Sequence, residues 1–484
     1  MKGSSVPSEL DALQGLLKKR YPDVPAFIVG GVLRDSFLGR HGRDIDLAVG
    51  SRAIPIARAF ARRIKGAFVL LDAETGCARV AKKKADGIWT FDLADFRAKT
   101  LTLDLKGRDF TINTFAVPLS SVTSARMIAG PMLSDPRARK DLKARTIRMV
   151  SSRAFRDDPL RLLRAYSLMA QLGFRIDPAT RKAIKAQARR IHDVSPERMR
   201  EELFKILASG RAAPTLRAMQ KDGFLFVLLP HLKVMHQVPQ GGYHHLDVWA
   251  HTLETVGQLE ALFCDCAGDA EIKDYLDEEI SGGHSRRAVM VFAALLHDIG
   301  KPDTKKKEPG GRTSFHGHEH VGKSLARIMA RQLLLSTRER HALEDLIALH
   351  LRPGYLSNFK KPSERMIFRF MRDAGEEAVA VLLLSLADQR ATRGPLTTAQ
   401  DVAHHEKICR SLIRAFFEKR KEAPFVRLID GHDLIRTLKM TPGPVFSKVL
   451  RAVEEAQHLG KVTTKKGALE AARKAAGLKA RRPS

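Results

Sequence analysis

The sequence predicts an α+β fold, in which an N-terminal head with a small mixed β-sheet and helices precedes an all-α remainder. Residues 24–120 alternate short β-branched or apolar runs with one clear helix, IPIARAFARRIKG, which is typical of such a head. From Ala154 onward, amphipathic helices follow one another with short Gly, Pro or Asp breaks. A chain of 484 residues is also too long for a single ordinary core, so two to four domains are expected.

Breaks in composition divide the chain into five expected segments. The Gly/His-rich stretch PQGGYHHLD, which starts at Pro239, marks one boundary, and KEAPFVRLIDGHDL marks another. The segments are an N-terminal helix in residues 1–23, the head in 24–150, a helical neck and body in 151–238, a helical domain rich in histidine in 239–420, and a C-terminal helical segment with a basic tail in 421–484.

The charge of the chain predicts a polyanionic partner. The formal net charge is +30 and the pI is about 10.2, and clustered Lys and Arg gain free energy by displacing counterions from phosphates. Nucleic acid is the leading candidate and a membrane surface the alternative, although no apolar run reaches the roughly 18 residues of a spanning helix. Four cysteines without a CxxC pair and an N-terminus without an apolar signal core favour the cytoplasm.

Two short motifs in the head carry chemistry. Gly30 and Gly31 stand between an expected strand and an expected helix, where backbone N–H groups can approach phosphate without a Cβ in the way. Asp44 and Asp46 lie two apart in the expected strand DIDLAV, so their carboxylates share one face and suit magnesium. Such a pair supports two-metal catalysis, with one ion at the attacking hydroxyl and one at the leaving pyrophosphate. Taken singly, GG is often only a turn and DxD often a solvated strand.

Four motifs in this order, VGGVLRD, DIDLAV, RDFTINTFAV and FRDDPLRLLRAYSLMAQLGFRID, resemble the bacterial class II tRNA nucleotidyltransferase and poly(A) polymerase family over residues 24 to about 235. The resemblance implies an enzyme that adds C and/or A from CTP and ATP to the tRNA 3′ end, with Mg²⁺ bound by Asp44 and Asp46. It implies these nucleotide-binding residues: Gly30, Gly31, Arg34, Arg108, Asp109, Asn113, Asp158, Arg161 and Arg164. The chain departs from the family pattern at Gly107, where an Arg is usual, and at Asp157, where a Glu is usual.

Asp158 and Arg161 are the expected base-selecting pair. Three residues apart on an expected helix, they share a face, where a carboxylate accepts from an exocyclic amine and a guanidinium donates to a ring acceptor. Both C and A offer such an edge, and the resemblance implies that the pair is an amino-acid template. The alternative is an ordinary i,i+3 salt bridge. Asp92, or equally Asp95, is a weaker candidate for a further carboxylate near the metals, and residues 195–207 resemble the family's neck helix.

The segment RAKTLTLDLKG before Arg108 is shorter than the flexible segment of full CCA-adding members. This shortening is consistent with CC addition alone or with a divergent branch. The sequence also leaves open A addition alone, a poly(A) polymerase, an RNA phosphohydrolase, and an RNA-binding scaffold with a silent site.

A second set of residues predicts a metal site in the histidine-rich domain. The apolar run AVMVFAALL ends in His297 and Asp298, and burying both costs several kcal/mol unless a partner such as a metal satisfies them. Together with His251 and Asp388 they resemble the HD phosphohydrolase domain. The resemblance implies that these four residues bind a divalent ion of unknown identity and that the domain hydrolyses phosphoesters, a decayed structural HD fold being the alternative. Further candidates are His318 and His350 for a second ion and Lys301 for phosphate.

The stretch from Asp430 to Lys474 resembles the C-terminal part of such fused proteins. Its Lys and Arg suit contact with an RNA backbone, or they form the exposed face of two helices.

Overall fold

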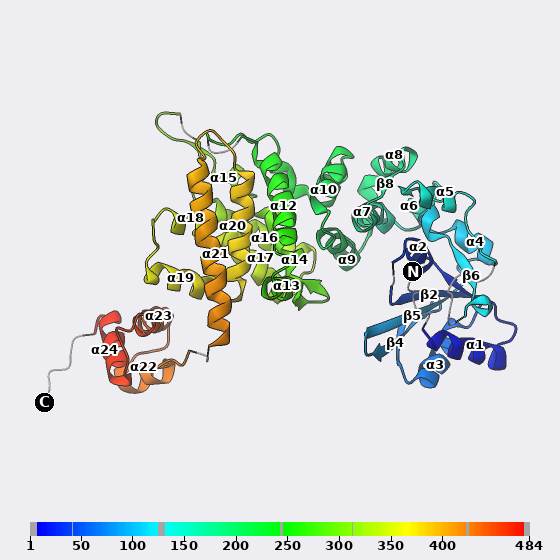
Figure 1. Cartoon of the computed structure of the whole chain (residues 1–484), viewed down its shortest axis with the longest axis horizontal. Coiled ribbons are helices and arrows are strands. Elements are labelled where there is room, and N and C mark those ends of the chain that lie inside the picture. Colours follow the sequence, from blue (N-terminus) through cyan, green and yellow to red (C-terminus); the bar gives the residue numbers. More distant parts are fainter. Residues whose placement is uncertain are drawn as a thin grey trace. The chain divides into compact units, whose positions relative to one another are not determined.

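A six-stranded mixed sheet forms the head of the computed structural model (Figure 1). Its order is β3-β4-β5-β2-β1-β6, and only the central pair β2 and β5 is parallel. The strands are β1 (Ala26–Val29), β2 (Asp44–Val49), β3 (Ala67–Asp72), β4 (Cys77–Lys84), β5 (Gly87–Asp95) and β6 (Ala116–Pro118). The parallel register places Asp46 directly beside Asp92, so the two carboxylates of neighbouring strands share one face.

Different helices pack on the two faces of the sheet. Helices α1 (Glu9–Arg20) and α3 (Ala53–Ile64) pack on the face formed by Ile45, Leu47 and Val49, and the main core lies there. Phe60 of α3 meets Phe91 of β5 edge to face at 5.3 Å between ring centroids. The short helix α4 (Leu101–Lys106) covers part of the opposite face, next to Val29 and Ala48. Because Asp44 and Asp46 alternate with the buried residues, their carboxylates lie on this less covered face.

The structure describes residues 7–40, 42–123, 131–242, 245–311, 313–422 and 425–478. They form two compact units, one made of Met1–Arg211 and Ala218–Leu228 and the other of Ala212–Arg217 and Leu229–Ser484. Within the described ranges, none of the helices combines the length and the apolar character that crossing a bilayer requires. The predicted fold class, a mixed-sheet head followed by helices, is confirmed.

Short helices connect the head to a helical neck in the first unit. They are α2 (Gly31–Phe37), α5 (Ala138–Lys143), α6 (Ala154–Asp157), α7 (Leu160–Leu172), α8 (Pro178–Gln187), α9 (Pro196–Leu207) and α11 (Leu225–Leu228), with the small strand pair β7 (Thr146–Ile147) and β8 (Arg175–Ile176). Helix α10 (Ala212–Lys221) is divided, because its first part, Ala212–Arg217, belongs to the second unit. Helix α9 is the expected neck helix. It packs against α7, where the Ser167 hydroxyl donates to the buried Glu202 carboxylate.

The second unit is a helical domain followed by a small C-terminal module. Its helices are α12 (Val248–Asp265), α13 (Ala270–Asp277), α14 (Arg286–Leu296), α15 (Lys301–Thr304), α16 (His318–Gln332), α17 (Thr337–Leu349), α18 (Arg352–Ser357), α19 (Glu364–Ala374), α20 (Ala378–Ala391) and α21 (Ala399–Lys421). Short strand pairs join β9 (Glu279–Ser281) to β10 (His284–Ser285) and β11 (Lys306–Lys307) to β12 (Thr313–Ser314). Every residue of α14 is buried except Arg287, which makes it the central helix of this domain.

The C-terminal module consists of α22 (Gly431–Leu438), α23 (Pro444–His458) and α24 (Lys465–Ala475), drawn in orange to red in Figure 1. It has a small core of its own that includes Leu434, Val449 and Ala468. The sequence suggested two helices here, and the third arises because the stretch before the PGP turn is helical as well.

Candidate functional site

Three carboxylates line one edge of the parallel strand pair. Asp44 and Asp46 project from β2 on one face, and Asp92 projects from β5 beside Asp46. Asp92 forms a two-pronged ion pair with Arg79 of β4, whose Nε and Nη2 atoms both lie 2.7 Å from its oxygens. The Asp44 carboxylate accepts a hydrogen bond from the Thr90 hydroxyl. Within the described ranges, no hydrogen bond or ion pair engages the Asp46 carboxylate, so it is available to a cation.

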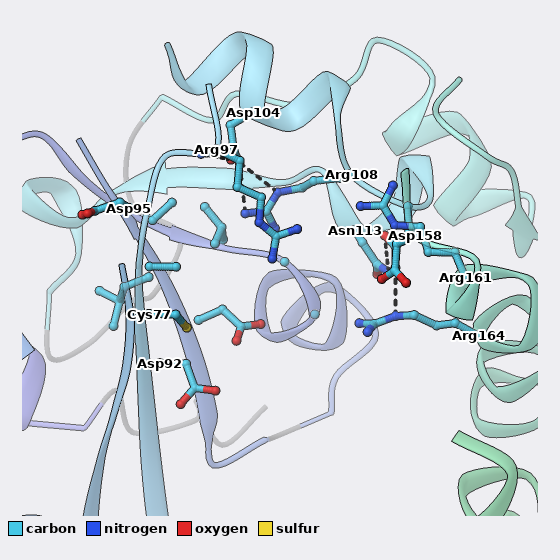
Figure 2. Close-up of a pocket in the computed structure, with 18 of the residues that line it drawn as sticks. Cys77, Asp92, Asp95, Arg97, Asp104, Arg108, Asn113, Asp158, Arg161 and Arg164 are labelled. Atoms are coloured by element: carbon cyan, nitrogen blue, oxygen red, sulfur yellow. Dashed lines mark hydrogen bonds and ion pairs between the residues drawn. The ribbon is translucent and has the colours of Figure 1, made fainter. Parts of the chain in front are cut away.

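A cavity of about 350 Å³ opens between this edge and the neck (Figure 2). Of the residues predicted from the motifs it is lined by Gly30, Gly31, Asp46, Arg108, Asp109, Asn113, Asp158, Arg161 and Arg164, together with Asp92 and Asp95. Asp44 and Arg34 are not among the lining residues. The structure thus gathers most of the predicted site, although its parts come from sequence positions more than 130 residues apart.

Gly30 sits where the backbone approaches the site most closely. Its φ is +80°, and a Cβ at this position would lie 3.2 Å from Asp46 Oδ2 and 3.3 Å from Arg108 Nη1. An L side chain is therefore disfavoured both by the backbone conformation and by the close contacts. Although the Asp46 carboxylate is accessible from the cavity, the protein around it removes solvent, and this desolvation, reinforced by the charge of Asp92, raises its pKa. A bound cation would stabilise the ionised form of this carboxylate.

A chain of polar contacts connects the Gly-Gly turn to the neck. Arg34 pairs with Asp35 at 2.8 Å and donates to Asn113 Oδ1 at 2.7 Å. Asn113 in turn donates to Asp109 at 3.1 Å, and Asp109 pairs with Arg164 of α7 at 2.8 Å. Burial alone would raise the pKa of Asp109, but Arg164, the Phe110 N–H and Asn113 outweigh it and lower that pKa. Arg34 thus lies behind the cavity wall and orients Asn113.

Asp158 and Arg161 line the same cavity, but not in the way the sequence suggested. Asp158 is not helical: it adopts an extended conformation (φ −148°, ψ 102°) between α6 and α7, because Pro159 disfavours helical φ and ψ at the residue before it. Its carboxylate pairs with Arg198 Nη2 of α9 at 2.9 Å and accepts from the Leu160 N–H at 3.2 Å. Arg161 is buried and donates to the Ala154 carbonyl at 3.2 Å. The prediction that Asp158 and Arg161 share one helix face is therefore wrong. Asp158 pairs with Arg198 instead.

The motifs did not reveal four other lining residues: Cys77, Arg97, Asp104 and Arg198. Arg198 lies on α9, the helix that resembles the neck helix. Of the two candidate carboxylates in β5, Asp92 faces Asp46, whereas the Asp95 carboxylate accepts from the Ala53 N–H at 2.8 Å at the start of α3.

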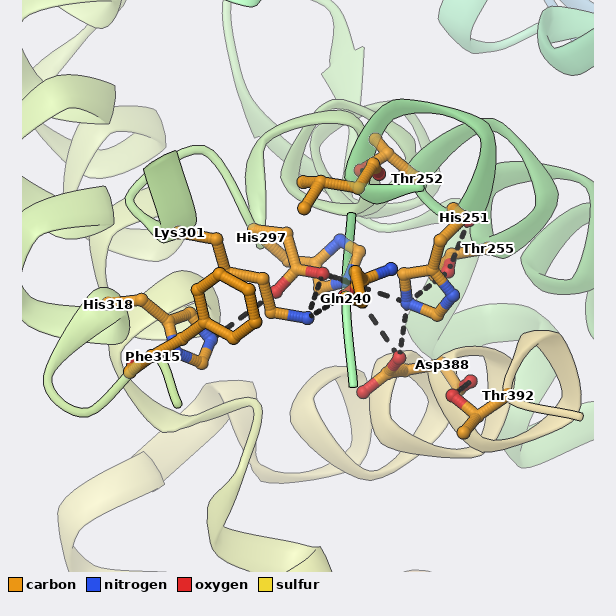
Figure 3. Close-up of polar contacts among 12 residues, drawn as sticks. Gln240, His251, Thr252, Thr255, His297, Lys301, Phe315, His318, Asp388 and Thr392 are labelled. Atoms are coloured by element: carbon orange, nitrogen blue, oxygen red, sulfur yellow. Dashed lines mark hydrogen bonds and ion pairs between the residues drawn. The ribbon is translucent and has the colours of Figure 1, made fainter. Parts of the chain in front are cut away.

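A second polar cluster lies at the centre of the helical domain (Figure 3). Its members come from five helices or their ends and were all predicted: His251, His297, Asp298, His318, His350 and Asp388. His251, His297 and Asp298 have ligand atoms within 4.8 Å of one another, and so do Asp298, His318 and His350. Asp298 belongs to both groups. Its Oδ2 lies 3.3 Å from His297 Nε2, and its Oδ1 lies 3.3 Å from His318 Nε2.

Asp388 completes the first group from α20. Its Oδ1 atom lies 2.9 Å from His251 Nε2 and 3.8 Å from His297 Nε2. Its side chain is 22% exposed, whereas those of His251, His297 and Asp298 are at most 2% exposed, so solvent approaches this group from the Asp388 side.

Three of the histidines are oriented in the same way. The Nδ1 atoms of His297, His318 and His350 lie 2.7–2.9 Å from the carbonyl oxygens three residues earlier, those of Ala294, Phe315 and Ile347. Each Nδ1–H donates to its carbonyl, so Nε2 is the nitrogen that faces the cluster. Such outer hydrogen bonds are usual for metal-ligating histidines.

The electrostatics of the cluster also favour a cation. Burial lowers the pKa of His350 to about 3, and the neighbouring His297 and His318 add to this effect, so its ring is neutral. Burial opposes the ionised form of Asp298, yet His297 and Lys301 hold its pKa well below the ordinary range. The buried His297 Nε2 has no hydrogen bond of good geometry among the described residues, so the donor set fits a bound divalent metal.

Lys301 connects this cluster to a cavity of about 460 Å³. Its Nζ atom lies 2.7 Å from Asp298 Oδ2 and 2.7 Å from Gln240 Oε1. Lys301 and His318 both line the cavity, and Phe315, Tyr355 and Leu396 form much of the rest of its wall. A ligand in this cavity thus has direct access to the cluster.

Three family profiles match the chain. Residues 26–148 match the poly A polymerase head domain, residues 173–235 match the family described as the probable RNA and SrmB-binding site of polymerase A, and residues 248–393 match the HD domain.

Two relatives resemble the chain over almost its whole length. An A-adding tRNA nucleotidyltransferase of Deinococcus radiodurans is 32% identical and covers 92% of this chain and 95% of its own. A CC-adding tRNA nucleotidyltransferase of Thermus thermophilus is 30% identical and covers 93% of each. Among solved structures, a CCA-adding enzyme in complex with ATP shares the fold, with a TM-score of 0.62 and 19% identity over 99% of this chain and 96% of its own.

Proposed function

The chain belongs to the tRNA nucleotidyltransferase family, and we propose that it adds C and/or A from CTP and ATP to the tRNA 3′ end, with release of pyrophosphate. The observation that carries this proposal is the single cavity in which Gly30, Asp46, Asp109, Asp158 and Arg161 meet. It combines a phosphate-binding turn, a carboxylate open to a cation and a pair of groups able to read a base.

We assign the metal ligands to Asp44 and Asp46, with Mg²⁺ as the ion. Both oxygens of Asp92 are held by Arg79, so Asp92 contributes charge to the site more than free ligand atoms. When bound, magnesium activates the attacking hydroxyl and neutralises the leaving pyrophosphate. The protein itself orients the reactants, because phosphoryl transfer depends mainly on positioning and charge stabilisation.

We assign base selection to Asp158 and Arg161. The Asp158 carboxylate accepts hydrogen bonds and the Arg161 guanidinium donates them, which matches the exocyclic amine and ring nitrogen of both C and A. Asn113, Asp109 and Arg164 form the wall between this pair and the Gly-Gly turn and are assigned to the sugar and triphosphate. The basic C-terminal segment 421–484 is assigned to the tRNA backbone, and a reducing cytoplasm is the expected location.

Three tRNA transcripts test the main activity. They end at the discriminator base, after C and after CC, and each is incubated with magnesium and CTP, ATP or both. Addition of two C and one A establishes CCA addition, and a stop after CC or a single A on the CC transcript identifies a CC-adding or A-adding enzyme. A long A tail indicates a poly(A) polymerase, and no incorporation on any transcript contradicts the proposal.

We further propose that the HD domain binds divalent metal through His251, His297, Asp298 and Asp388, with His318 and His350 at a second position that shares Asp298. The Nε2 atoms that face the cluster support this assignment. When bound, the metal activates water against a phosphoester, and Lys301 is placed to bind the phosphate.

Metal content tests the HD assignment independently of catalysis. We expect the purified protein to hold a divalent metal that His297→Ala loses and Asp44→Ala retains at this site, as measured by elemental analysis. Metal-dependent phosphate release from RNA ends should follow the same pattern. Equal metal content in His297→Ala and the wild type would refute the assignment and leave the tRNA activity unaffected.

A further inference from the structure

The arginines of the nucleotide cavity differ in whether their guanidinium groups already have a hydrogen-bond or ion-pair partner. Five of them line it, and four have a partner. Arg108 pairs with Asp104 at 3.4 Å, Arg164 with Asp109 at 2.8 Å and Arg198 with Asp158 at 2.9 Å. The fourth, Arg161, donates to the Ala154 carbonyl at 3.2 Å.

Arg97 is the fifth. It lies two residues after the end of β5, and its backbone N–H donates to Asp104 Oδ1 at 3.0 Å, which fixes the start of its side chain. Figure 2 shows this side chain extending beside Arg108 toward the middle of the lining residues. Within the described ranges, neither a hydrogen bond nor an ion pair engages the Arg97 guanidinium. The other oxygen of Asp104 is engaged by Arg108.

The carboxylates of the cavity show the complementary pattern. Asp92, Asp95, Asp104, Asp109 and Asp158 all have partners. Asp46 alone among the lining aspartates of the described chain has none. The cavity therefore presents one open negative group on β2 and one open positive group after β5.

Arg97 also acts electrostatically on a second arginine of the cavity, Arg161. Burial lowers the pKa of Arg161, and the nearby charge of Arg97 is among the further effects that lower it, although Asp109 and Asp158 act in the opposite direction. Arg97 and Arg161 line the same cavity, and the planar guanidinium fork matches phosphate oxygens.

We propose that Arg97 binds the distal phosphates of the incoming nucleoside triphosphate. This inference rests on the proposed nucleotidyltransferase function and adds a substrate contact to it. Asp46 holds the cation and Arg97 holds the anion, so both unsatisfied groups of the cavity are used by one metal-bound triphosphate. The base is read elsewhere, by Asp158 and Arg161, so Arg97 contributes equally to CTP and ATP.

Paired binding measurements test this contact. Calorimetry with magnesium compares CTP and CMP on the wild type, Arg97→Ala and the control Lys99→Ala, which removes an exposed positive charge outside the cavity. Loss of a hydrogen-bonded ion pair should weaken CTP binding to Arg97→Ala about tenfold to a hundredfold. CMP binding should stay within about twofold of wild type, as should both ligands with Lys99→Ala.

Each other outcome contradicts the assignment. Unchanged CTP binding by Arg97→Ala excludes the contact, and an equal loss for CTP and CMP places Arg97 at the sugar or base instead. Weaker tRNA binding with unchanged CTP binding assigns Arg97 to an RNA phosphate. A wild-type protein that binds neither CTP nor ATP overturns the proposed function itself, which separates that failure from a failure at Arg97. Thermal melting of Arg97→Ala checks that the exposed substitution leaves the fold intact.

Discussion

Substituting Gly30 by alanine tests whether the Gly-Gly turn sets the geometry of the cavity. The added Cβ would lie 3.2 Å from Asp46 Oδ2 and 3.3 Å from Arg108 Nη1, at a backbone φ of +80°. Gly39 provides a matched control, because its φ is +69° and a Cβ there meets no atom within 4 Å. Gly39→Ala therefore introduces backbone strain of similar kind without the contacts.

The two effects have different magnitudes. Backbone strain of this kind costs about 1–3 kcal/mol, reduced by roughly 0.4–1 kcal/mol because alanine restricts the unfolded chain. We therefore expect both variants to lose about 1–2 kcal/mol of stability, or a few °C in Tm. In Gly30→Ala, Asp46 and Arg108 must also shift by a few tenths of an ångström. Since a shift of about 1 Å in reacting groups costs on the order of a hundredfold in rate, we expect a loss of about tenfold.

The assay measures nucleotide incorporation into tRNA well below both melting temperatures, with Tm recorded for each variant. Gly30→Ala should lose about tenfold in kcat/KM, and Gly39→Ala should stay within about twofold of wild type. A fully active Gly30→Ala variant would show that the close approach of Gly30 to Asp46 has no catalytic role. An equal loss in Gly39→Ala would show that strain alone accounts for the effect.

Three further outcomes follow from contacts in the cavity and within the two helical regions. Asp158→Ala should change the ratio of kcat/KM for CTP and ATP more than total turnover, and an unchanged ratio would contradict the template assignment. The Arg327 hydrogen bonds lower the pKa of Glu344 to about 2 from an ordinary 4.5, so its contribution is complete above pH 4.5 and is lost as pH falls toward 2. Glu344→Gln should therefore cost about 2 kcal/mol in denaturant unfolding at pH 7 and almost nothing near pH 2, and a pH-independent cost would refute this. The buried Tyr166 hydroxyl lies 2.9 Å from Asp222. Tyr166→Phe should cost about 1 kcal/mol, and Asp222→Ala should cost more because it leaves the hydroxyl unpaired; the reverse order in urea unfolding would contradict the pairing.

Part of the candidate site could be predicted because three of its groups are close in sequence. Gly30, Asp44 and Asp46 stand within one strand-helix-strand unit, where period and spacing determine which face each side chain takes. Arg198 could not be predicted in this way, because its partner Asp158 lies 40 residues earlier and only the packing of α9 against α7 brings them together.

The extended conformation of Asp158 could be predicted from the sequence. Pro159 directly follows it, and a residue before proline is biased away from the helical region. The helix of LRLLRAYSLMAQL begins at Leu160, two residues after Asp158. In the HD domain, the residue types predicted the cluster, but the shared use of backbone carbonyls by three histidines depends on where α14, α16 and α17 begin or end.

The ion pair between Arg198 and Asp158 has an evolutionary consequence. The Asp158 carboxylate is paired with a side chain on another helix, so a substitution in α9 can change its orientation while Asp158 and Arg161 stay the same. Under the proposed assignment, relatives that keep both template residues can diverge in the nucleotide they add through changes in their neck helices. Sequence comparison of the template motif alone would not detect such divergence.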